Sequence, residues 1–349
     1  MKINFNTLGL SSGGGNRVII ELSNRLVDRG HDVTISAVTL QRFDWYGKEN
    51  IKAKLNMAFP SVITRIIHQR IQHKYYVDVQ LDLLKKIIPD CDVNIATFCL
   101  TVAPTVDSHK GKPFYLVQNY EPWFFTDPKL IKIANDSYDS PAIKICVSHW
   151  LEQKTGGIYI GNGVNTDVFK PKLTFSEKEP NSIIYFYRGM SGKRDDLALE
   201  CLSKLYEKKK SKIHIVAQSN FAKTINPNFR FELHTCLSDI ELAKVYSSAR
   251  ILLYTSSFEG FGLPPLEALA CGTNVVSTPF TGNEFLVDKE NCFLAKTPEK
   301  ITSHIIELLE NDELALEHLS NGKSTVADHN FDKMIDILEN LFEKNVKKQ

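Results

Sequence analysis

The chain carries no excess of charge of either sign, and this lack argues against a nucleic-acid-binding protein. Its 349 residues include 42 Lys and Arg against 41 Asp and Glu, which gives a formal net charge of +1. Proteins that bind nucleic acid through its phosphates usually carry a basic patch or stripe. We therefore expect no nucleic-acid partner.

The sequence also lacks paired cysteines and long apolar runs. Its seven cysteines are scattered and form no C-x-x-C pair, which predicts reduced thiols in the cytoplasm. No apolar stretch reaches the roughly 20 residues that span a bilayer. Residues 1–6 are too polar for the apolar part of a secretory signal. The expected location is cytoplasmic.

Two nucleotide-binding motifs are missing as well. The glycines near the amino terminus do not fit G-x-G-x-x-G, and no Gly-Lys-Ser/Thr follows them, which weakens the dinucleotide and P-loop interpretations. Gly13, Gly14 and Gly15 nevertheless join an expected strand to an expected helix. Their amides could converge on an anion at that helix N-terminus. The alternative is a simple flexible turn.

Apolar runs that alternate with helix-period segments predict the α/β class with parallel sheets. The length and the 43% hydrophobic content suffice for two cores. A turn-rich stretch at 160–171 is the best domain boundary. Expected strands are 2–8, 32–38, 93–98, 114–118, 143–148, 183–186, 213–217 and 251–254, and expected helices are 18–27, 197–208, 239–248, 266–270 and 331–348.

The most informative string follows the apolar run 249–254. Glu259 and Glu267 stand eight positions apart around Gly260, Gly262 and a double proline. Prolines fit the first turn of a helix, where N–H groups have no intrahelical partner, so Glu267 is expected in the opening turn. The glycines permit unusual backbone dihedrals and close approach to a ligand, and the helix dipole faces an anion.

From Ser256 through Gly272 this string resembles the E-x7-E signature of the family-4 retaining glycosyltransferases, which use nucleotide sugars. The stretch 160–171 is similar to the segment where that family's chain passes between domains, with Asn165 in place of the usual Asp. The resemblance implies the GT-B fold, in which two Rossmann-like domains face each other with parallel sheets across a cleft. The implied parts are an acceptor-side domain at 1–163, a nucleotide-sugar domain at 164–330 and a helix at 331–349 that packs back on the first domain.

Two cations follow the first strand of the second series. Arg188 can meet phosphate oxygens as a planar fork and Lys193 as a point charge. Relatives carry a similar pair, which neutralises the leaving pyrophosphate. Tyr187 stands where a glycine is common, and Arg194 could take the place of Lys193.

The resemblance implies that the two glutamates contact different parts of the nucleotide-sugar donor. Glu259 is expected at the transferred sugar, beside the developing oxocarbenium ion, and Glu267 at the ribose hydroxyls. The predicted catalytic residues are Glu259, Arg188, Lys193 and Glu121. The predicted donor-binding residues are Gly14, Gly15, Ser256, Gly260, Phe261, Gly262, Leu263 and Glu267.

The acceptor side is expected after the strand 114–118. Gln118, Asn119 and Glu121 stand where many relatives have His-Asp, and Trp123 follows. This pattern is similar to a subgroup that includes rhamnosyltransferases. Glu121 could orient or deprotonate the acceptor, although the donor phosphate can serve as the base. The alternative is that these aromatic residues form core.

No metal and no cofactor are expected. Asp90 and Asp92 mimic a D-x-D metal motif but precede a strand instead of ending one. His68 and His73 lie on residues 65–75, which are expected to form a basic amphipathic helix with a solvated face. Alternatively, the cations of 48–76 could contact anionic lipid headgroups, where lipid-linked acceptors reside.

Three functions remain open. The first is a retaining glycosyltransferase that moves a hexose or deoxyhexose to a hydroxyl of a glycan or lipid-linked glycan in cell-surface polysaccharide synthesis. The second is a sugar epimerase or phosphorylase on the same scaffold, and the third is a non-catalytic binding partner. Glu259, Glu267, Arg188 and Lys193 are all present, which favours the first.

Overall fold

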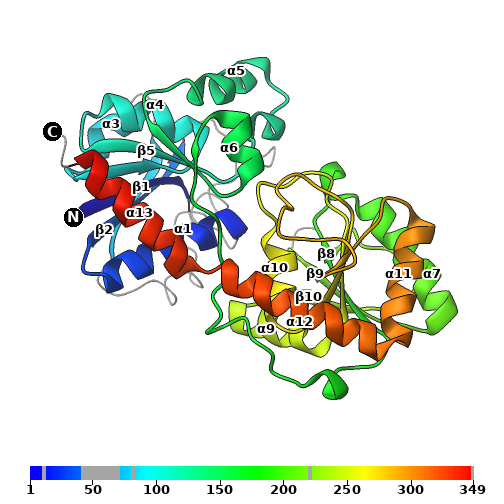
Figure 1. Ribbon diagram of the computed structural model, residues 1–349. Helices are drawn as coiled ribbons and strands as arrows, with labels where there is room; N and C mark the ends of the chain where they lie inside the picture. Colours follow the sequence, from blue (N-terminus) through cyan, green and yellow to red (C-terminus); the bar gives the residue numbers. More distant parts are fainter. Residues whose placement is uncertain (10–12, 41–70, 80–82, 219–221, 347–349) are drawn as a thin grey trace. The chain divides into compact units, whose positions relative to one another are not determined.

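The computed structural model describes residues 1–9, 13–40, 71–79, 83–218 and 222–346, which divide into two units (Figure 1). Unit 1 comprises Met1–Asn162 together with Phe331–Gln349, and unit 2 comprises Gly163–Asn330. Each unit has a parallel sheet and a core of its own. The chain is an α/β protein with two parallel sheets among its described residues, as expected.

The described part of unit 1 has a seven-stranded parallel sheet of order β3-β2-β1-β4-β5-β6-β7. The strand order reverses between β1 and β4, and ligands of open α/β sheets bind at the carboxyl ends of strands at such a switch point. The glycines of the amino-terminal loop directly follow β1. The strands are β1 (Lys2–Leu8), β2 (Asp32–Leu40), β3 (Gln72–Val79), β4 (Val93–Ala96), β5 (Lys112–Val117), β6 (Ile143–Cys146) and β7 (Ile158–Tyr159).

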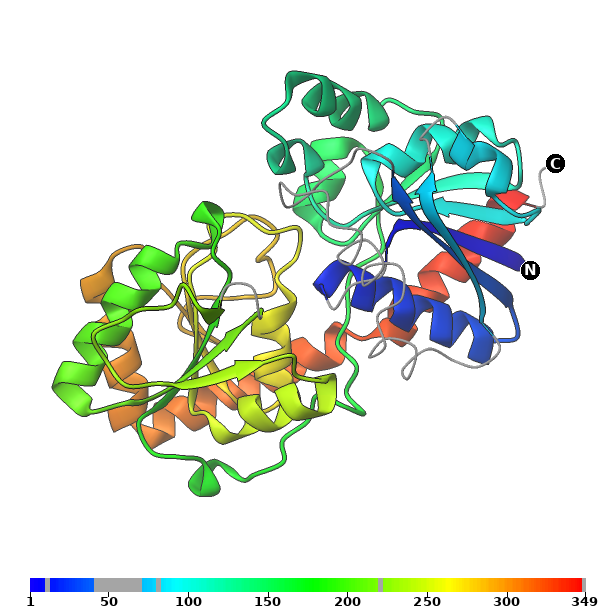
Figure 2. The same ribbon diagram turned by 180° about the vertical axis from the view of Figure 1, so that it is seen from behind.

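The helices of unit 1 include one from the far end of the chain. Helix α13 lies beside α1 in both views (Figure 1, Figure 2), and its buried Phe342 meets Phe114 of β5 with ring centroids 5.0 Å apart. Arg25 on α1 pairs with Asp332 at 2.6 Å. The helices are α1 (Gly14–Asp28), α3 (Leu84–Ile87), α4 (Cys99–Asp107), α5 (Pro128–Ser137), α6 (His149–Thr155) and α13 (Phe331–Val346).

The helix expected at 65–75 is wrong where it can be checked. Residues 72–79 form strand β3, which pairs in parallel with β2 from Thr34 opposite Gln72 onward. Residues of the Tyr75-Tyr76-Val77 type favour a pleated strand, and pairing with β2 outweighs the helical spacing of the apolar positions. His73 therefore lies on β3, whereas His68 and most of 48–76 lie outside the described residues, so the expected membrane contact has no structural description.

Unit 2 has a six-stranded parallel sheet of order β10-β9-β8-β11-β12-β13 among its described residues, with the reversal between β8 and β11. Helices α7 and α11 pack on each other, and α10 packs on α9 and α12, with the sheet between the two groups in Figure 1. The strands are β8 (Ser182–Tyr187), β9 (Lys212–Ala217), β10 (Glu232–Thr235), β11 (Ile251–Tyr254), β12 (Asn274–Ser277) and β13 (Phe293–Leu294). The helices are α7 (Asp195–Lys209), α9 (Asp239–Ser248), α10 (Leu263–Ala270), α11 (Pro298–Glu310) and α12 (Asp312–Asp328).

Apart from the helix at 65–75, the strands and helices expected from periodicity are present, with ends that differ by a few residues. Expected strand 2–8 coincides with β1, and expected helix 239–248 coincides with α9. The two prolines lie in the first turn of α10, and Gly272, with a φ of +68°, follows its end, as predicted. No helix among the described residues is long and apolar enough to cross a membrane.

Candidate functional site

The loops after β8 and β11 form the best candidate site, because they leave the sheet of unit 2 at its switch point. They are joined through the backbone: the Ser257 amide donates to the Gly192 carbonyl at 2.9 Å. The Thr255 hydroxyl donates to the Lys193 carbonyl at 2.8 Å. A Cβ at Gly192 would lie 2.7 Å from the Phe258 ring, so any larger residue would require that ring to shift.

Glu259 is the centre of these contacts. Its Oε1 accepts hydrogen bonds from Lys193 Nζ at 2.5 Å, from Ser256 Oγ at 2.7 Å and from the Tyr254 hydroxyl. Its backbone amide donates to Thr281 Oγ1 at 3.0 Å. All three of these side-chain bonds go to the same oxygen, and within the described residues none reaches Oε2. The carboxylate is therefore fixed in orientation and keeps one oxygen for a ligand.

The charge of this carboxylate follows from its partners. Burial alone would raise the pKa of Glu259, but the Lys193 ammonium and the hydroxyl donors outweigh it and hold that pKa below its usual value. Burial and the neighbouring Glu259 raise the pKa of the Tyr254 hydroxyl well above normal, so Tyr254 remains a donor. The site presents an ionised carboxylate at neutral pH.

Arg188 is positioned through its backbone, and its side chain is half-buried. Its backbone amide donates to Asp195 Oδ1 at 3.2 Å, and the next amide, of Gly189, donates to Asp195 Oδ2 at 2.8 Å. The guanidinium lies 5.1 Å from the centroid of the Phe186 ring. In the described part of the chain, Lys193 pairs with a carboxylate but Arg188 does not. The two predicted cations are thus in different electrostatic surroundings.

The start of α10 has the predicted backbone, with one correction. Gly262, at the N-cap, has a φ of +92°, and a Cβ there would lie 2.7 Å from the Phe280 ring. Gly260 has no positive φ, so only one of the two glycines needs the left-handed region. The Phe261 side chain is buried and stacks on Phe285 at 4.7 Å. Only the backbone of Phe261 can therefore meet a ligand, while Leu263 is half-buried.

Glu267 differs from its expected placement. Leu263, Pro264 and Pro265 occupy the first turn of α10, so Glu267 lies in the second turn. It is 2% exposed, and the Tyr246 hydroxyl donates to its Oε2 at 3.1 Å. A carboxylate in this position supports α9 against α10, and its predicted contact with ribose stays a prediction.

In unit 1, the glycine loop and the predicted acceptor residues are brought together. Helix α1 begins at Gly14 with no side-chain cap and no acidic residue in its first turn. A Cβ at Gly15 would lie 3.4 Å from the Gln118 amide group, so Gln118 lies beside the N-terminus of α1. Asn119 is half-buried, and its Oδ1 accepts from the Tyr120 amide at 2.8 Å.

Aromatic side chains continue from this edge. Trp123 is 42% exposed and stacks on Trp150 with centroids 5.3 Å apart. Tyr120 meets Trp123 edge-on at 5.1 Å, and Lys154 Nζ lies 5.0 Å from the Tyr120 ring centroid. The aromatic cluster is thus partly accessible, unlike core.

Glu121 has surroundings that favour a structural role. It is 2% exposed, and its Oε2 accepts from the Cys99 amide at 2.5 Å, at the start of α4. Burial raises its pKa to about 7, against the opposing hydrogen bond from Cys99. That value suits a general base, but the carboxylate caps a helix and is closed to solvent.

Asp90 and Asp92, which resemble a D-x-D metal motif in sequence, both contact other protein groups. Asp92 Oδ2 accepts from the Lys2 amide at 2.7 Å, and Asp90 lies 3.7 Å from Lys110 Nζ. Sequence reasoning missed Tyr254, Thr281 and Asp195, which position the loops. Only Tyr254 could have been identified from the sequence, because it is the last residue of the strand that leads into the loop of Glu259.

Comparison with known proteins shows similarity to glycosyltransferases. Residues 169–325 match the family model of the group 1 glycosyl transferases. An uncharacterized glycosyltransferase of Methanocaldococcus jannaschii is 25% identical over 221 residues, which are 57% of this chain and 59% of that protein. O-antigen chain mannosyltransferase B of Escherichia coli is 39% identical over 80 residues, 21% of this chain and 20% of that protein. The chain thus spans less than two thirds of these curated relatives.

Solved structures share the fold over the whole chain. Anabaena HepE in complex with UDP-glucose has a TM-score of 0.79 at 14% identity and covers 99% of this chain and 100% of its own. Sucrose-phosphate synthase from Thermosynechococcus elongatus has a TM-score of 0.76 at 14% identity with full coverage of both chains. At such low identity the likeness concerns the fold.

Proposed function

We propose that this chain is a group 1 glycosyltransferase that transfers a sugar from a nucleotide diphosphate sugar to a hydroxyl acceptor and retains the configuration at the sugar carbon. The observation that carries the proposal is Glu259, ionised and held through one oxygen by Lys193, Ser256 and Tyr254. The fixed carboxylate keeps Oε2 for sugar hydroxyls. The family match over residues 169–325 supports the same reaction class.

The reaction places charge where these side chains can meet it. Cleavage of the sugar–phosphate bond leaves negative charge on the nucleotide diphosphate and positive charge on the sugar ring. We assign the leaving phosphate to the Arg188 guanidinium and to Lys193, helped by the amides at the Gly262 helix start. Glu259 stabilises the developing oxocarbenium ion. The cationic side chains supply the charge that a metal ion provides in other transferases.

Lys193 serves two partners in this scheme. Before the donor binds, its ammonium pairs with Glu259 at 2.5 Å. A diphosphate bound near the Gly189–Lys193 backbone would also pair with the Lys193 ammonium. The ion pair between Lys193 and Glu259 would then weaken, and the Glu259 carboxylate would interact more strongly with the positive charge on the sugar ring. Arg188, which has no carboxylate partner among the described residues, is the permanent phosphate ligand.

The acceptor is proposed to be a glycan or a lipid-linked glycan of a cell-surface polysaccharide. Gln118 and Asn119 supply hydrogen bonds, and the exposed Trp123 supplies an aromatic face for a sugar ring. The relative from Escherichia coli is named for O-antigen synthesis, which agrees with this acceptor class. A place at the cytoplasmic face of a membrane would bring lipid-linked acceptors within reach.

A donor panel tests the proposal. Purified chain is incubated with UDP-, GDP- and dTDP-sugars and candidate oligosaccharide acceptors without added metal, and nucleotide release and product are measured. We expect one donor class to release nucleotide diphosphate and form a product with the donor's anomeric configuration by NMR. Conversion of donor without acceptor would indicate an epimerase, and phosphate-dependent release of a sugar phosphate would indicate a phosphorylase. No release from any donor would contradict catalysis and favour a binding partner.

A further inference from the structure

A second group of ligand-type side chains lies in unit 2 away from the loops described above. His214 on β9 stands directly opposite Glu232 on β10, and His234 follows two positions later on the same face of β10. His214 is buried, His234 is half-buried and Glu232 is exposed. His214 and Glu232 lie in the amino-terminal halves of their strands, whereas Glu259 and Arg188 follow the carboxyl ends of parallel strands.

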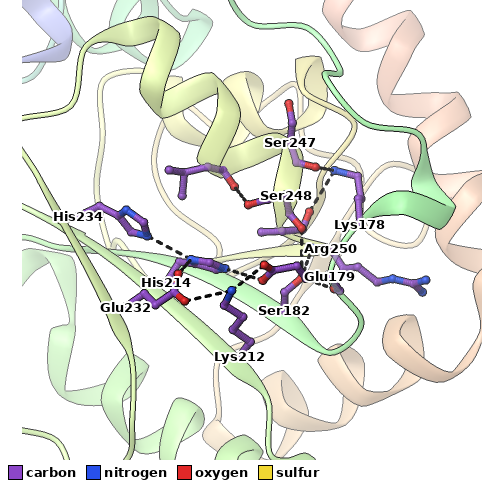
Figure 3. Close-up of polar contacts among 12 residues, drawn as sticks. Lys178, Glu179, Ser182, Lys212, His214, Glu232, His234, Ser247, Ser248 and Arg250 are labelled. Carbon is purple, nitrogen blue, oxygen red and sulfur yellow. Dashed lines mark hydrogen bonds and ion pairs between the residues drawn. The ribbon is translucent and has the colours of Figure 1, made fainter.

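The three side chains converge through one atom each (Figure 3). His214 Nδ1 lies 3.1 Å from His234 Nε2 and 3.3 Å from Glu232 Oε2, and the three ligand atoms all lie within 4.8 Å of one another. In a tetrahedral zinc site with bonds of about 2.0–2.1 Å, neighbouring ligand atoms are roughly 3.3–3.4 Å apart. The two separations that involve His214 Nδ1 are thus close to those of such a site, and the third, between His234 and Glu232, lies within 4.8 Å.

The remaining nitrogen of His214 has the partner that a metal-bound imidazole usually has. His214 Nε2 lies 3.2 Å from Glu179 Oε2, and because a carboxylate only accepts, Nε2 carries the proton. Metal-ligating histidines commonly donate their other N–H to a carboxylate in this way, which fixes the ring and the tautomer.

This tautomer leaves a conflict that protein groups only partly resolve. Neutral His214 presents the lone pair of Nδ1, which can accept from His234 Nε2 at 3.1 Å. Glu232 Oε2, another acceptor, lies 3.3 Å from the same nitrogen. Lys212 Nζ bonds the opposite oxygens, Glu179 Oε1 at 2.6 Å and Glu232 Oε1 at 3.0 Å. The ammonium therefore lowers the negative charge of the cluster but does not stand between Nδ1 and Oε2. A cation bound among the three ligand atoms would separate Nδ1 from Oε2 and interact favourably with both.

We propose that His214, His234 and Glu232 bind a divalent transition-metal ion of the zinc class, with a water as fourth ligand and Glu179 as the carboxylate that orients His214. Two imidazoles and one carboxylate suit zinc better than the hard cations Mg²⁺ and Ca²⁺. No local motif marks this site, because its ligands come from two strands and His214 and Glu232 are 18 positions apart.

The ion would act on the fold and not on sugar transfer. Strand β10 is the edge strand of the sheet and pairs with β9 alone over Glu232–Thr235. Two ligands on β10 and one on β9 would tie this edge down. Through Glu179, whose amide also donates to Ser248 at 3.1 Å, the ion would also fasten the segment before β8.

Metal binding is tested on the whole chain carrying Cys236→Ser, because the exposed thiol of Cys236 lies two positions from His234. Protein stripped with a chelator is dialysed against micromolar Zn²⁺, Co²⁺ or Mg²⁺, and bound metal is measured by mass spectrometry. We expect one Zn²⁺ per chain, a visible absorption spectrum of four-coordinate Co²⁺, and no Mg²⁺. Zinc should raise the Tm of the transition of unit 2 by at least about 2 °C.

Matched variants locate the site. His234→Ala and Glu232→Gln, at the less buried ligands, should weaken zinc binding at least about tenfold and abolish the Tm shift, and Glu179→Gln should weaken binding about 10–100-fold. His109→Asn removes an exposed histidine of unit 1, at a φ of +53° that asparagine tolerates, and should change nothing. Failure to take up zinc, or uptake that His234→Ala and Glu232→Gln leave unchanged, would overturn the proposal. Neither outcome bears on sugar transfer.

Discussion

Glu259 is held by one of its two oxygens, and this asymmetry determines what a substitution does. In Glu259→Gln the amide oxygen still accepts from Ser256 and Tyr254, but the ionic bond to Lys193 and the charge on the second oxygen are lost. We expect kcat to fall at least about tenfold, or about 1.4 kcal/mol, with a smaller change in donor binding. Initial rates at saturating donor measure this.

The control for that variant is Glu299→Gln. Glu299 is an exposed carboxylate paired with Lys204 at 2.8 Å on the surface of unit 2, and exposed pairs contribute little. Its rate should equal that of the wild type. An unchanged kcat in Glu259→Gln would remove Glu259 from the mechanism.

Glu121 gives a pH-dependent prediction. Burial raises its pKa in the folded chain to about 7, from an ordinary value near 4.5. Between these values the folded chain binds more protons than the unfolded chain, so this group's contribution to stability is complete below about pH 4.5 and is lost as pH rises to about 7. Glu121→Gln removes the titration and should gain stability over the wild type by about 3 kcal/mol between pH 4.5 and 8.

Urea unfolding of both proteins across this pH range measures the difference. A difference in unfolding free energy that is independent of pH would contradict a raised pKa. Glutamine can still accept from the Cys99 amide, so the variant should retain sugar transfer. A loss of kcat with intact folding would restore Glu121 as the acceptor base.

At the scale of elements, helix α13 contributes core to unit 1 from the far end of the chain. Phe342 is fully buried against Phe114, whereas Ile337 on the same helix is 38% exposed. We expect Phe342→Ala to lower the unfolding free energy of unit 1 by about 3–5 kcal/mol. Ile337→Ala is the matched control and should cost much less. Equal losses in chemical denaturation would show that burial does not govern this helix.

Local sequence patterns predicted most helices and strands. Elements whose conformation depends on pairing with residues distant in the sequence were not predicted correctly. Strand β1 and helix α9 were predicted from strict apolar periodicity. The start of strand β3 was mistaken for the end of a helix at 65–75, because its conformation is set by pairing with β2 and not by the local spacing of apolar residues. Helices α11 and α12 carry ordinary amphipathic patterns with capping Thr297 and Asn311, and these signals could have been found.

The candidate site shows the same division. The string around Glu259 was sufficient to select the loop, since glycines and prolines act through local backbone geometry. The contact between Lys193 and Glu259 joins loops 66 positions apart, and no local pattern encodes it. The burial of Glu121 and Glu267 likewise depends on neighbours contributed by other elements, namely Cys99 and Tyr246.

For the whole molecule, the continuity of unit 2 leads to a further prediction. Residues 163–330 contain a complete six-stranded sheet and a core built from both helix groups. Expressed alone, this segment should fold with a single cooperative thermal transition. Residues 1–162 alone lack α13 and should be less stable than unit 1 within the full chain. Circular dichroism of the two fragments checks both, and an unfolded 163–330 fragment would contradict the independence of unit 2.

The return of α13 to unit 1 has a consequence for synthesis. A ribosome releases the chain from the amino terminus, and domains generally fold as units as they emerge. All of unit 2 is made before α13, so unit 2 can be complete while the first 162 residues still wait for the helix that covers Phe114. During that interval the surface later covered by Phe342 stays open to chaperones, which makes the newly made first unit their expected client.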